Sequence, residues 1–384
     1  MIGAVSMGGK GEKARAMARA GPNARQASGG IGFMENSVSR ILVETVVKRT
    51  LRDMKEDPER SIRNLIDRAL LVSEGRFQKR FFQTAQRMLH NERSAYYPLV
   101  RSLVENVEHA RLLGFGMNVG YNSCTVCAKK IRALEGAEGF NIPWSLYLEI
   151  HADRFHKNRQ RYASLLDEGK ALGIYTWFFH ADGFSADLFR LMALHPDCAF
   201  VLLCPPEGMD GALVGEAERL NHLMLGVGLN AQAERVCRTL RERKMLYGVY
   251  CRYGEDRLDD ILSDSLLHEA QALGAPFTLF LPETSCRQEM QAKVYDYVRR
   301  IRDEQRFPTI PYELFRDSMA VDTVISDDGC SVGFRADGSF FMLADCGEKR
   351  RVTFCERPLR DILRTCLPKR TNGDAILSSA RSPS

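Results

Sequence analysis

Short apolar runs rich in β-branched and aromatic residues recur after residue 111, and amphipathic segments separate them. The candidate strands are residues 112–119, 174–180, 198–204, 223–229, 246–252 and 277–282. Segments between them, such as YASLLDEGKALG and AERVCRTLRERK, repeat apolar residues at the spacing of a helix. Strands that alternate with helices predict a parallel sheet with right-handed crossovers, which closes readily into a barrel. The segment WSLYLEI is either another strand or the start of a helix.

The regions on either side of this repeat have different patterns. Residues 33–111 place apolar side chains at helical intervals, as at Val43, Val47 and Leu51, and predict several packed helices. Near the C-terminus, Ala336-Asp337-Gly338 separates two apolar alternating runs and predicts a hairpin turn. The expected division is a basic disordered tail (1–32), a helical N-terminal region (33–111), a β/α barrel (112–306), a small C-terminal extension (307–368) and a flexible tail (369–384).

Composition narrows the class of protein. No apolar run approaches the roughly 18–20 residues that span a bilayer, and the first residues lack the apolar core of a secretory signal, so we expect a cytoplasmic protein without a membrane partner. The 11 cysteines are then expected to be thiols, metal ligands or catalytic groups rather than disulfides. Residues 1–90 hold 17 Lys and Arg against 9 Asp and Glu, a net charge of +8, and the remainder carries −3, which gives +5 in all. An acidic partner could bind this basic region. Without helix-turn-helix or zinc-finger spacing, we do not expect nucleic-acid binding.

The residues that follow the candidate strands carry the possible chemistry, because the carboxyl ends of parallel strands in a barrel converge on one mouth. These positions hold Cys124, Cys127, His180, Asp182, Cys204, Cys251 and Arg252. The sequence therefore predicts four thiols on one face of the barrel. Thiols in apolar strands, such as Cys204 and Cys251, can equally serve as small buried apolar groups.

Other motifs give weaker indications. His151, Asp153 and His156 could bind a metal, but two histidines five positions apart do not share one helix face, and exposed polar residues are the favoured interpretation. The chain contains no Walker phosphate loop, no GxSxG nucleophile elbow and no HExxH zinc motif. These enzyme classes have no support in the sequence.

The segment MNVGYNSCTVCAKKI resembles the CxxxCxxC cluster loop of the radical S-adenosylmethionine (SAM) superfamily, with Gly120 in place of the first cysteine. The resemblance continues through YASLLDEGKALGIYTWFFHADG and LRERKMLYGVYCRYGED. It extends to DGCSVGFRADGSFFMLADC, which is similar to the cysteine-bearing tail of SPASM-like members, and covers about residues 110–365. In that family three thiolates hold a [4Fe-4S] cluster whose free iron chelates SAM.

The resemblance implies the positions of ligands. The implied metal ligands are Cys124, Cys127, Cys204, Cys251, Cys330 and Cys346, and the implied SAM contacts are His180, Asp182 and Arg252. Cys204, Cys251 or His180 would substitute for the missing first cysteine. Cys355 and Cys366 match no family position as well and are expected to be structural thiols.

Several SAM-facing positions depart from the family pattern. His180-Ala181-Asp182 stands in place of Gly-Gly-Glu, Cys204-Pro205-Pro206 in place of a TNG-like turn, and Tyr253-Gly254 near Arg252 in place of a polar contact. The expected fold is an α/β, radical-SAM-like partial (β/α)6 barrel with a helical N-terminal region and a small C-terminal extension. One hypothesis is reductive SAM cleavage, altered or lost, on a peptide or small-molecule substrate; the other is a non-catalytic ligand-binding or regulatory protein. The departures favour lost or altered catalysis.

Overall fold

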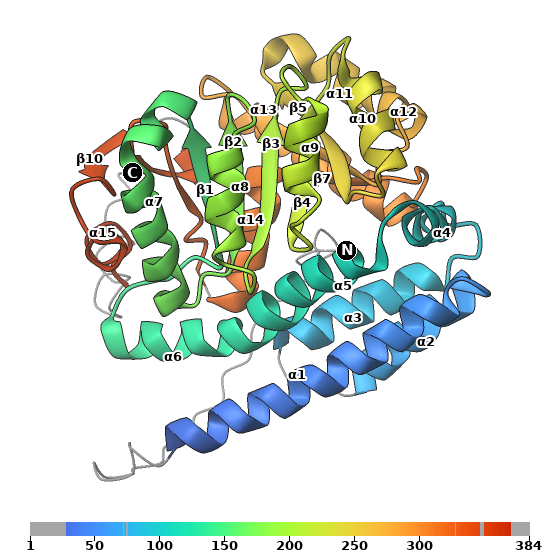
Figure 1. Ribbon diagram of the computed structural model, residues 1–384, viewed down its shortest axis with the longest axis horizontal. Coiled ribbons are helices and arrows are strands. Elements are labelled where there is room, and N and C mark those ends of the chain that lie inside the picture. Colours follow the sequence, from blue (N-terminus) through green and yellow to red (C-terminus); the bar gives the residue numbers. More distant parts are fainter. Residues whose placement is uncertain (1–27, 72, 74–75, 327, 346–348, 370–384) are drawn as a thin grey trace, which may run out of the picture.

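A computed structural model of the chain describes residues 28–71, 73, 76–326, 328–345 and 349–369 (Figure 1). It is a mixed α/β structure built on one ten-stranded sheet. Residues 1–27 and 370–384 of the two expected tails lie outside this description. Helix α1 (Ser28–Asp53) begins within the segment that was expected to be a tail.

The sheet has the strand order of a partial barrel. Its order is β10-β9-β8-β1-β2-β3-β4-β5-β6-β7, and all pairs from β8 through β1 to β7 are parallel. The strands are β1 (Ser145–Ile150), β2 (Thr176–Ala181), β3 (Ala199–Cys204), β4 (Leu223–Gly228), β5 (Tyr247–Tyr253), β6 (Phe277–Pro282), β7 (Ile310–Glu313), β8 (Val332–Phe334), β9 (Ser339–Met342) and β10 (Lys349–Thr353). Neighbouring strands follow each other along the chain from β1 to β7, as expected for successive β/α units.

Helices connect these strands and cover the sheet. The connecting helices are α7 (Ala152–Leu172), α8 (Ala186–Ala193), α9 (Gly211–Ala217), α10 (Ala233–Glu242), α11 (Leu258–Leu262), α12 (Ser265–Ala272), α13 (Gln288–Glu304) and α14 (Leu314–Ile325). In Figure 1, α7, α8 and α9 lie in front of the sheet, whereas α14 lies behind it. On that inner side, Phe315 of α14 packs edge-on against Tyr147 of β1, with ring centroids 5.2 Å apart.

The N-terminal helices pack against the segments that lead into the strands. They are α1, α2 (Pro58–Leu71), α3 (Arg76–Leu89), α4 (Tyr96–Asn106), α5 (His109–Met117), the π-helix η2 (Asn118–Cys127) and α6 (Ala128–Glu138). The amide of Glu108 donates to the carbonyl of Lys244, just before β5, and the amide of Ala95 donates to Gln305, before β7. The helical region therefore lies at the amino-terminal end of the sheet, opposite the mouth.

The sequence patterns predicted most of the strands. Five candidate strands are confirmed as β2 to β6, and WSLYLEI forms β1. The prediction of a strand at residues 112–119 is wrong, because these residues belong to α5 and the start of η2. Arg111 and Met117 of α5 are buried. The predicted hairpin turn is confirmed between β8 and β9, with Gly338 at a φ of +83°.

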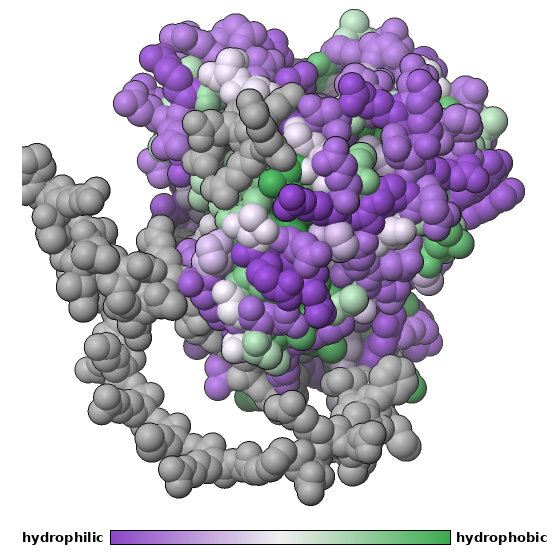
Figure 2. Space-filling model, turned by 90° about the vertical axis from the view of Figure 1, so that its left-hand side faces the viewer, coloured by the Kyte–Doolittle hydropathy of each residue, from purple (hydrophilic) through white to green (hydrophobic). Residues whose placement is uncertain are grey.

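The surface of the barrel is largely polar. Figure 2 shows that the face carrying β10, α7 and α15 (Leu359–Cys366) is mostly hydrophilic, with small hydrophobic spots between the charged side chains. The apolar side chains instead fill the space between sheet and helices, where Trp144, Trp177 and Phe200 are fully buried. Within the described residues, no helix combines the length and apolar character needed to cross a membrane.

Candidate functional site

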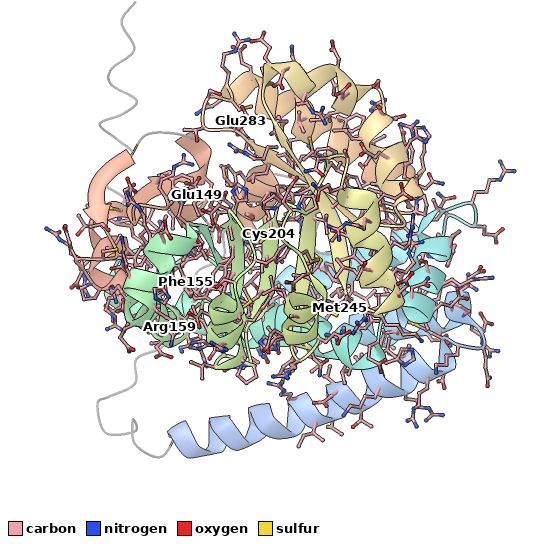
Figure 3. The ribbon with its side chains drawn as sticks, turned by 45° about the horizontal axis from the view of Figure 1, so that its top comes forward. Glu149, Phe155, Arg159, Cys204, Met245 and Glu283 are labelled. Atoms are coloured by element: carbon pink, nitrogen blue, oxygen red, sulfur yellow. The ribbon has the colours of Figure 1, made fainter. Side chains whose placement is uncertain are left out.

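The mouth of the barrel gathers side chains from the carboxyl ends of several strands. Tyr147 and Glu149 of β1 alternate onto the same face as His180 of β2, because Glu149 and His180 are in register. In Figure 3, Glu149 and Cys204 mark the ends of β1 and β3 and Glu283 follows β6, while Met245 marks the approach to β5 at the other end. A binding site is therefore expected at this end of the sheet.

Three rings form the floor of the mouth. The hydroxyl of Tyr147 lies 3.0 Å from Nδ1 of His180, and the His180 ring meets Tyr250 of β5 with centroids 5.7 Å apart. Tyr250 reaches over β4 because Gly228 has no side chain: a Cβ there would lie 3.4 Å from the Tyr250 ring. The glycine in β4 thus leaves the space that the Tyr250 ring occupies.

Two arginines at the mouth differ in their partners. Arg335, which follows β8, lies 2.5 Å from Glu149 and stacks over the Phe341 ring at 3.9 Å. Arg252 lies two positions after Tyr250 on the same strand face, is exposed, and forms no hydrogen bond or ion pair through its guanidinium within the described part of the chain. The mouth therefore holds one neutralised and one available positive charge.

His180 is neutral at neutral pH. Burial, and then the nearby charge of Arg252, lower the pKa of His180 to about 4. When the Tyr147 hydroxyl donates to Nδ1, the single proton of the neutral imidazole lies on Nε2. His180 then offers a hydrogen-bond donor without adding charge.

Asp182 has a local structural partner. Its carboxylate lies 2.9 Å from Nδ1 of His151, and it accepts a hydrogen bond from the amide of Ala152 at 3.1 Å, where α7 begins. His156 instead pairs with Asp187 at 3.5 Å. His151, Asp153 and His156 are exposed, and the two histidines face different carboxylates, which is the favoured interpretation of exposed polar residues.

Cys124 and Cys127 lie at the opposite end of the barrel from the mouth. Both are on η2, where Ser123 hydrogen-bonds Thr176 at the start of β2 (2.8 Å) and Asn122 donates to the carbonyl of Asp197, ahead of β3. The expectation that these thiols follow a strand fails because the preceding segment is helical. Burial raises the pKa of each thiol to about 12.

The other two expected thiols point away from the mouth. Leu203 is in register with His180, so Cys204, the next residue, lies on the opposite face, where its thiol is 3.6 Å from the carbonyl of Gly183. Cys251 lies between the inward-facing Tyr250 and Arg252, and its sulfur is 3.8 Å from a nitrogen of Arg257. The prediction of four thiols on one face is therefore wrong.

The C-terminal cysteines add no ligand to the mouth. Cys330 is buried before β8, 3.3 Å from the hydroxyl of Ser326, and burial raises the pKa of its thiol well above the usual range. Cys346 lies outside the described residues. In the part of the chain that is described, no three His, Cys, Asp or Glu side chains are grouped as metal ligands. The described residues therefore do not fit a [4Fe-4S] cluster, which needs several thiolates around one space.

Four residues of the mouth were missed by sequence reasoning. Tyr147, Glu149 and Tyr250 would follow from strand alternation once WSLYLEI is taken as a strand. Arg335 carries no comparable signal, because its partner Glu149 is 186 positions away.

Comparison with known proteins gives distant structural similarity. No family model and no curated protein matches the chain. Streptococcus suis SuiB bound to precursor peptide SuiA matches at 10% identity with a TM-score of 0.46, over 61% of this chain and 68% of that chain. SuiB bound to S-adenosylmethionine matches at 10% identity with a TM-score of 0.45, over 65% of this chain and 72% of that chain. Native anSMEcpe with bound AdoMet matches at 10% identity with a TM-score of 0.35, over 58% of this chain and 75% of that chain. At 10% identity and TM-scores below 0.5, these similarities are distant.

Proposed function

We propose that this chain is a radical-SAM-like barrel that binds a small carboxylate-bearing molecule at its mouth without an iron–sulfur cluster. The observation that supports this proposal is the exposed Arg252, whose guanidinium has no partner among the described residues and lies near the neutral His180. Planar guanidinium groups bind carboxylates through two parallel hydrogen bonds.

The neighbouring side chains suit the same ligand. Nε2 of His180 supplies a second donor, and the rings of His180 and Tyr250 offer a surface for an apolar or planar part of the molecule. Glu149 is paired with Arg335, so it does not oppose the charge of Arg252. SAM carries an amino-acid carboxylate, and it is the first probe because the sequence resembles the radical SAM superfamily.

The first experiment measures iron and acid-labile sulfide after strictly anaerobic reconstitution of the native protein, Gly120→Cys and Cys124→Ala. No stoichiometric cluster is expected in any of them, because Cys124 and Cys127 are buried at the end away from the mouth. A Cβ at position 120 meets no atom within 4 Å, so the added thiol should not disturb the fold. A stoichiometric cluster in the native protein that is lost in Cys124→Ala would overturn the cluster-free part of the proposal.

The second experiment measures the binding of SAM and S-adenosylhomocysteine by calorimetry. Arg252→Ala should weaken binding at least about tenfold, since a charged hydrogen-bonding pair is lost. Arg238→Ala is the matched control, because Arg238 is an exposed arginine that pairs with Glu234 on α10. Lack of binding by both compounds, or equal binding by Arg252→Ala, would refute a carboxylate site at the mouth.

A further inference from the structure

A cavity lies at the end of the barrel opposite the mouth, where the N-terminal helices meet the sheet. Its volume is about 420 Å³, and its walls come from the end of α1, the start of α2, α4, the link to α5, and Lys244 before β5. This volume falls within the range of small-molecule sites. The cavity shares none of its lining residues with the mouth, so it is a separate space.

The floor of the cavity is apolar. Met54, Val104 and Val107 line it and are 4%, 7% and 4% exposed. A cavity that only held water would gain nothing from such a floor, whereas an apolar side chain of a ligand would bury surface against it, worth about 25 cal/mol per Å².

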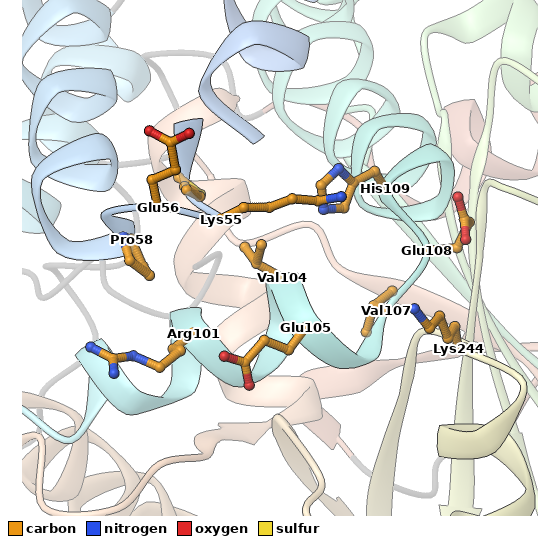
Figure 4. Close-up of a pocket in the computed structure, with 11 residues that line it drawn as sticks. Lys55, Glu56, Pro58, Arg101, Val104, Glu105, Val107, Glu108, His109 and Lys244 are labelled. Atoms are coloured by element: carbon orange, nitrogen blue, oxygen red, sulfur yellow. The ribbon is translucent and has the colours of Figure 1, made fainter. Parts of the chain in front are cut away.

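Charged groups of both signs surround this floor. Figure 4 shows Val104 between Lys55 and Glu105, with the Lys55 side chain extending toward His109. The charged ends of Lys55 and Glu105 form no ion pair or hydrogen bond with another described residue. Nε2 of His109 is buried and also lacks a partner there. A buried ring nitrogen without a partner is costly, which favours a ligand that supplies one.

The backbone around the cavity is fixed. Glu108 donates its amide to the carbonyl of Lys244 at 2.9 Å, and Lys244 has a φ of +51° although it is not a glycine. The next turn is held by Arg111, which donates to the carbonyls of Glu218 and Leu220 at 2.7 and 3.2 Å. Hydrogen bonds thus join the helical wall at the start of α5 to the barrel wall on both sides of β4.

We propose that this cavity binds a free amino acid with an apolar side chain, such as leucine or phenylalanine. The ligand carboxylate lies against Lys55 and Nε2 of His109, the ammonium group against Glu105, and the side chain on Val104, Met54 and Val107. A zwitterion with an apolar side chain meets charges of both signs and the apolar floor, whereas a simple anion or cation meets charges of one sign only.

Calorimetry with leucine and phenylalanine tests this proposal. Both should bind the native protein; glycine should bind at least about tenfold more weakly because it lacks the apolar side chain, and N-acetyl-leucine amide because it lacks both charges. Lys55→Gln and Glu105→Gln should each weaken leucine binding about tenfold or more, and His109→Phe should weaken it while keeping a ring in place. Lys157→Gln and Glu242→Gln, at exposed sites on α7 and α10, are the matched controls.

The outcomes separate this site from the mouth. Leucine binding should be unchanged in Arg252→Ala, and SAM binding should be unchanged in Lys55→Gln. Absence of leucine and phenylalanine binding up to about 10 mM, weaker than the millimolar range of poor ligands, would overturn the proposal. So would equal binding by Lys55→Gln, Glu105→Gln and their controls, with thermal unfolding of each variant verifying that it is folded.

Discussion

At the scale of single residues, the protonation of His180 makes the stability of the folded protein depend on pH. Its pKa is lowered from 6.5 to about 4, first by burial and then by Arg252. The unfolded chain therefore binds a proton between these two values that the folded chain does not. The contribution of His180 to stability is complete above about pH 6.5, falls as the pH is lowered toward 4, and changes no further below that.

We expect a nuclear magnetic resonance titration to give His180 a pKa near 4, and Arg252→Ala to raise it, because a nearby positive charge is removed. His180→Phe should flatten the loss of stability between pH 6.5 and 4. A His180 pKa near 6.5 in the native protein would show that the ring is not buried as described.

The thiols offer a second test at this scale. Cys124 and Cys127 are buried with pKa values of about 12, whereas Cys355 is exposed. Since the thiolate is the reactive form, iodoacetamide at pH 8 should label Cys355 in the native protein and reach Cys124 and Cys127 only after unfolding. Peptide mass spectrometry identifies the labelled positions, and rapid labelling of Cys124 in the native state would contradict the burial of η2.

At the scale of elements, two glycines of α5 test the helix that replaced an expected strand. A Cβ at Gly114 would lie 2.6 Å from the carbonyl oxygen of Asn221, whereas a Cβ at Gly116 would meet nothing within 4 Å. Gly116→Ala should stabilise the protein by up to about 1 kcal/mol through helix propensity, and Gly114→Ala should destabilise it by about 1–3 kcal/mol through the clash.

Urea unfolding measures both variants. In a strand, neither glycine would gain from alanine through helix propensity, so a stabilised Gly116→Ala supports the helix. Equal effects at the two positions would contradict the close approach of α5 to the segment before β4.

Apolar runs predicted strands β2 to β6 correctly and failed at residues 112–119, where the run belongs to helices. Strands β2 to β6 are apolar runs between clear helices, and each is confirmed. LLGFGMNV is as apolar as a buried strand. In the structure it continues the helix that begins at His109, and Gly114 of this helix lies close to Asn221. Single-sequence patterns cannot distinguish a short buried strand from a buried helix segment.

The sequence predicts some residues of the candidate site and not others, because it shows where strands end but not which segments are strands or which strands pair. His180 and Arg252 follow from the strand ends. Cys124 and Cys127 lie at the other end of the barrel because the segment before them is a helix and not a strand. Cys204 and Cys251 follow strands, but strand alternation puts them on the face opposite His180 and Tyr250. Arg335 required knowledge that β8 pairs with β1.

At the scale of the whole molecule, one buried ion pair joins α13 and α14, the two helices that flank β7 in the chain. Arg302 of α13 contacts both carboxylate oxygens of Asp317 of α14, at 2.7 and 2.8 Å, and also donates to the carbonyl of Pro311 in β7. The two side chains are 5% and 4% exposed. Each charge depends on the other, because neither is hydrated.

Asp317→Leu should destabilise the fold by about 3–5 kcal/mol, since it leaves the Arg302 charge buried without its partner. The double variant Arg302→Met/Asp317→Leu should recover part of this loss. Urea unfolding of Arg302→Met, Asp317→Leu and the double variant gives the coupling free energy between the two side chains. Strictly additive losses in the free energy of unfolding would show that the pair does not act as a unit.

The pairing of β1 with β8 has a consequence for how the protein is made. The two strands are contributed by distant parts of the chain, and Glu149 and Arg335, next to this junction, are 186 positions apart. A ribosome releases β1 long before β8, so the growing polypeptide must hold one open edge of its sheet until β8 has been synthesised. Such late, long-range closure slows folding and exposes an unpaired strand to other nascent chains, where chaperones would be expected to act.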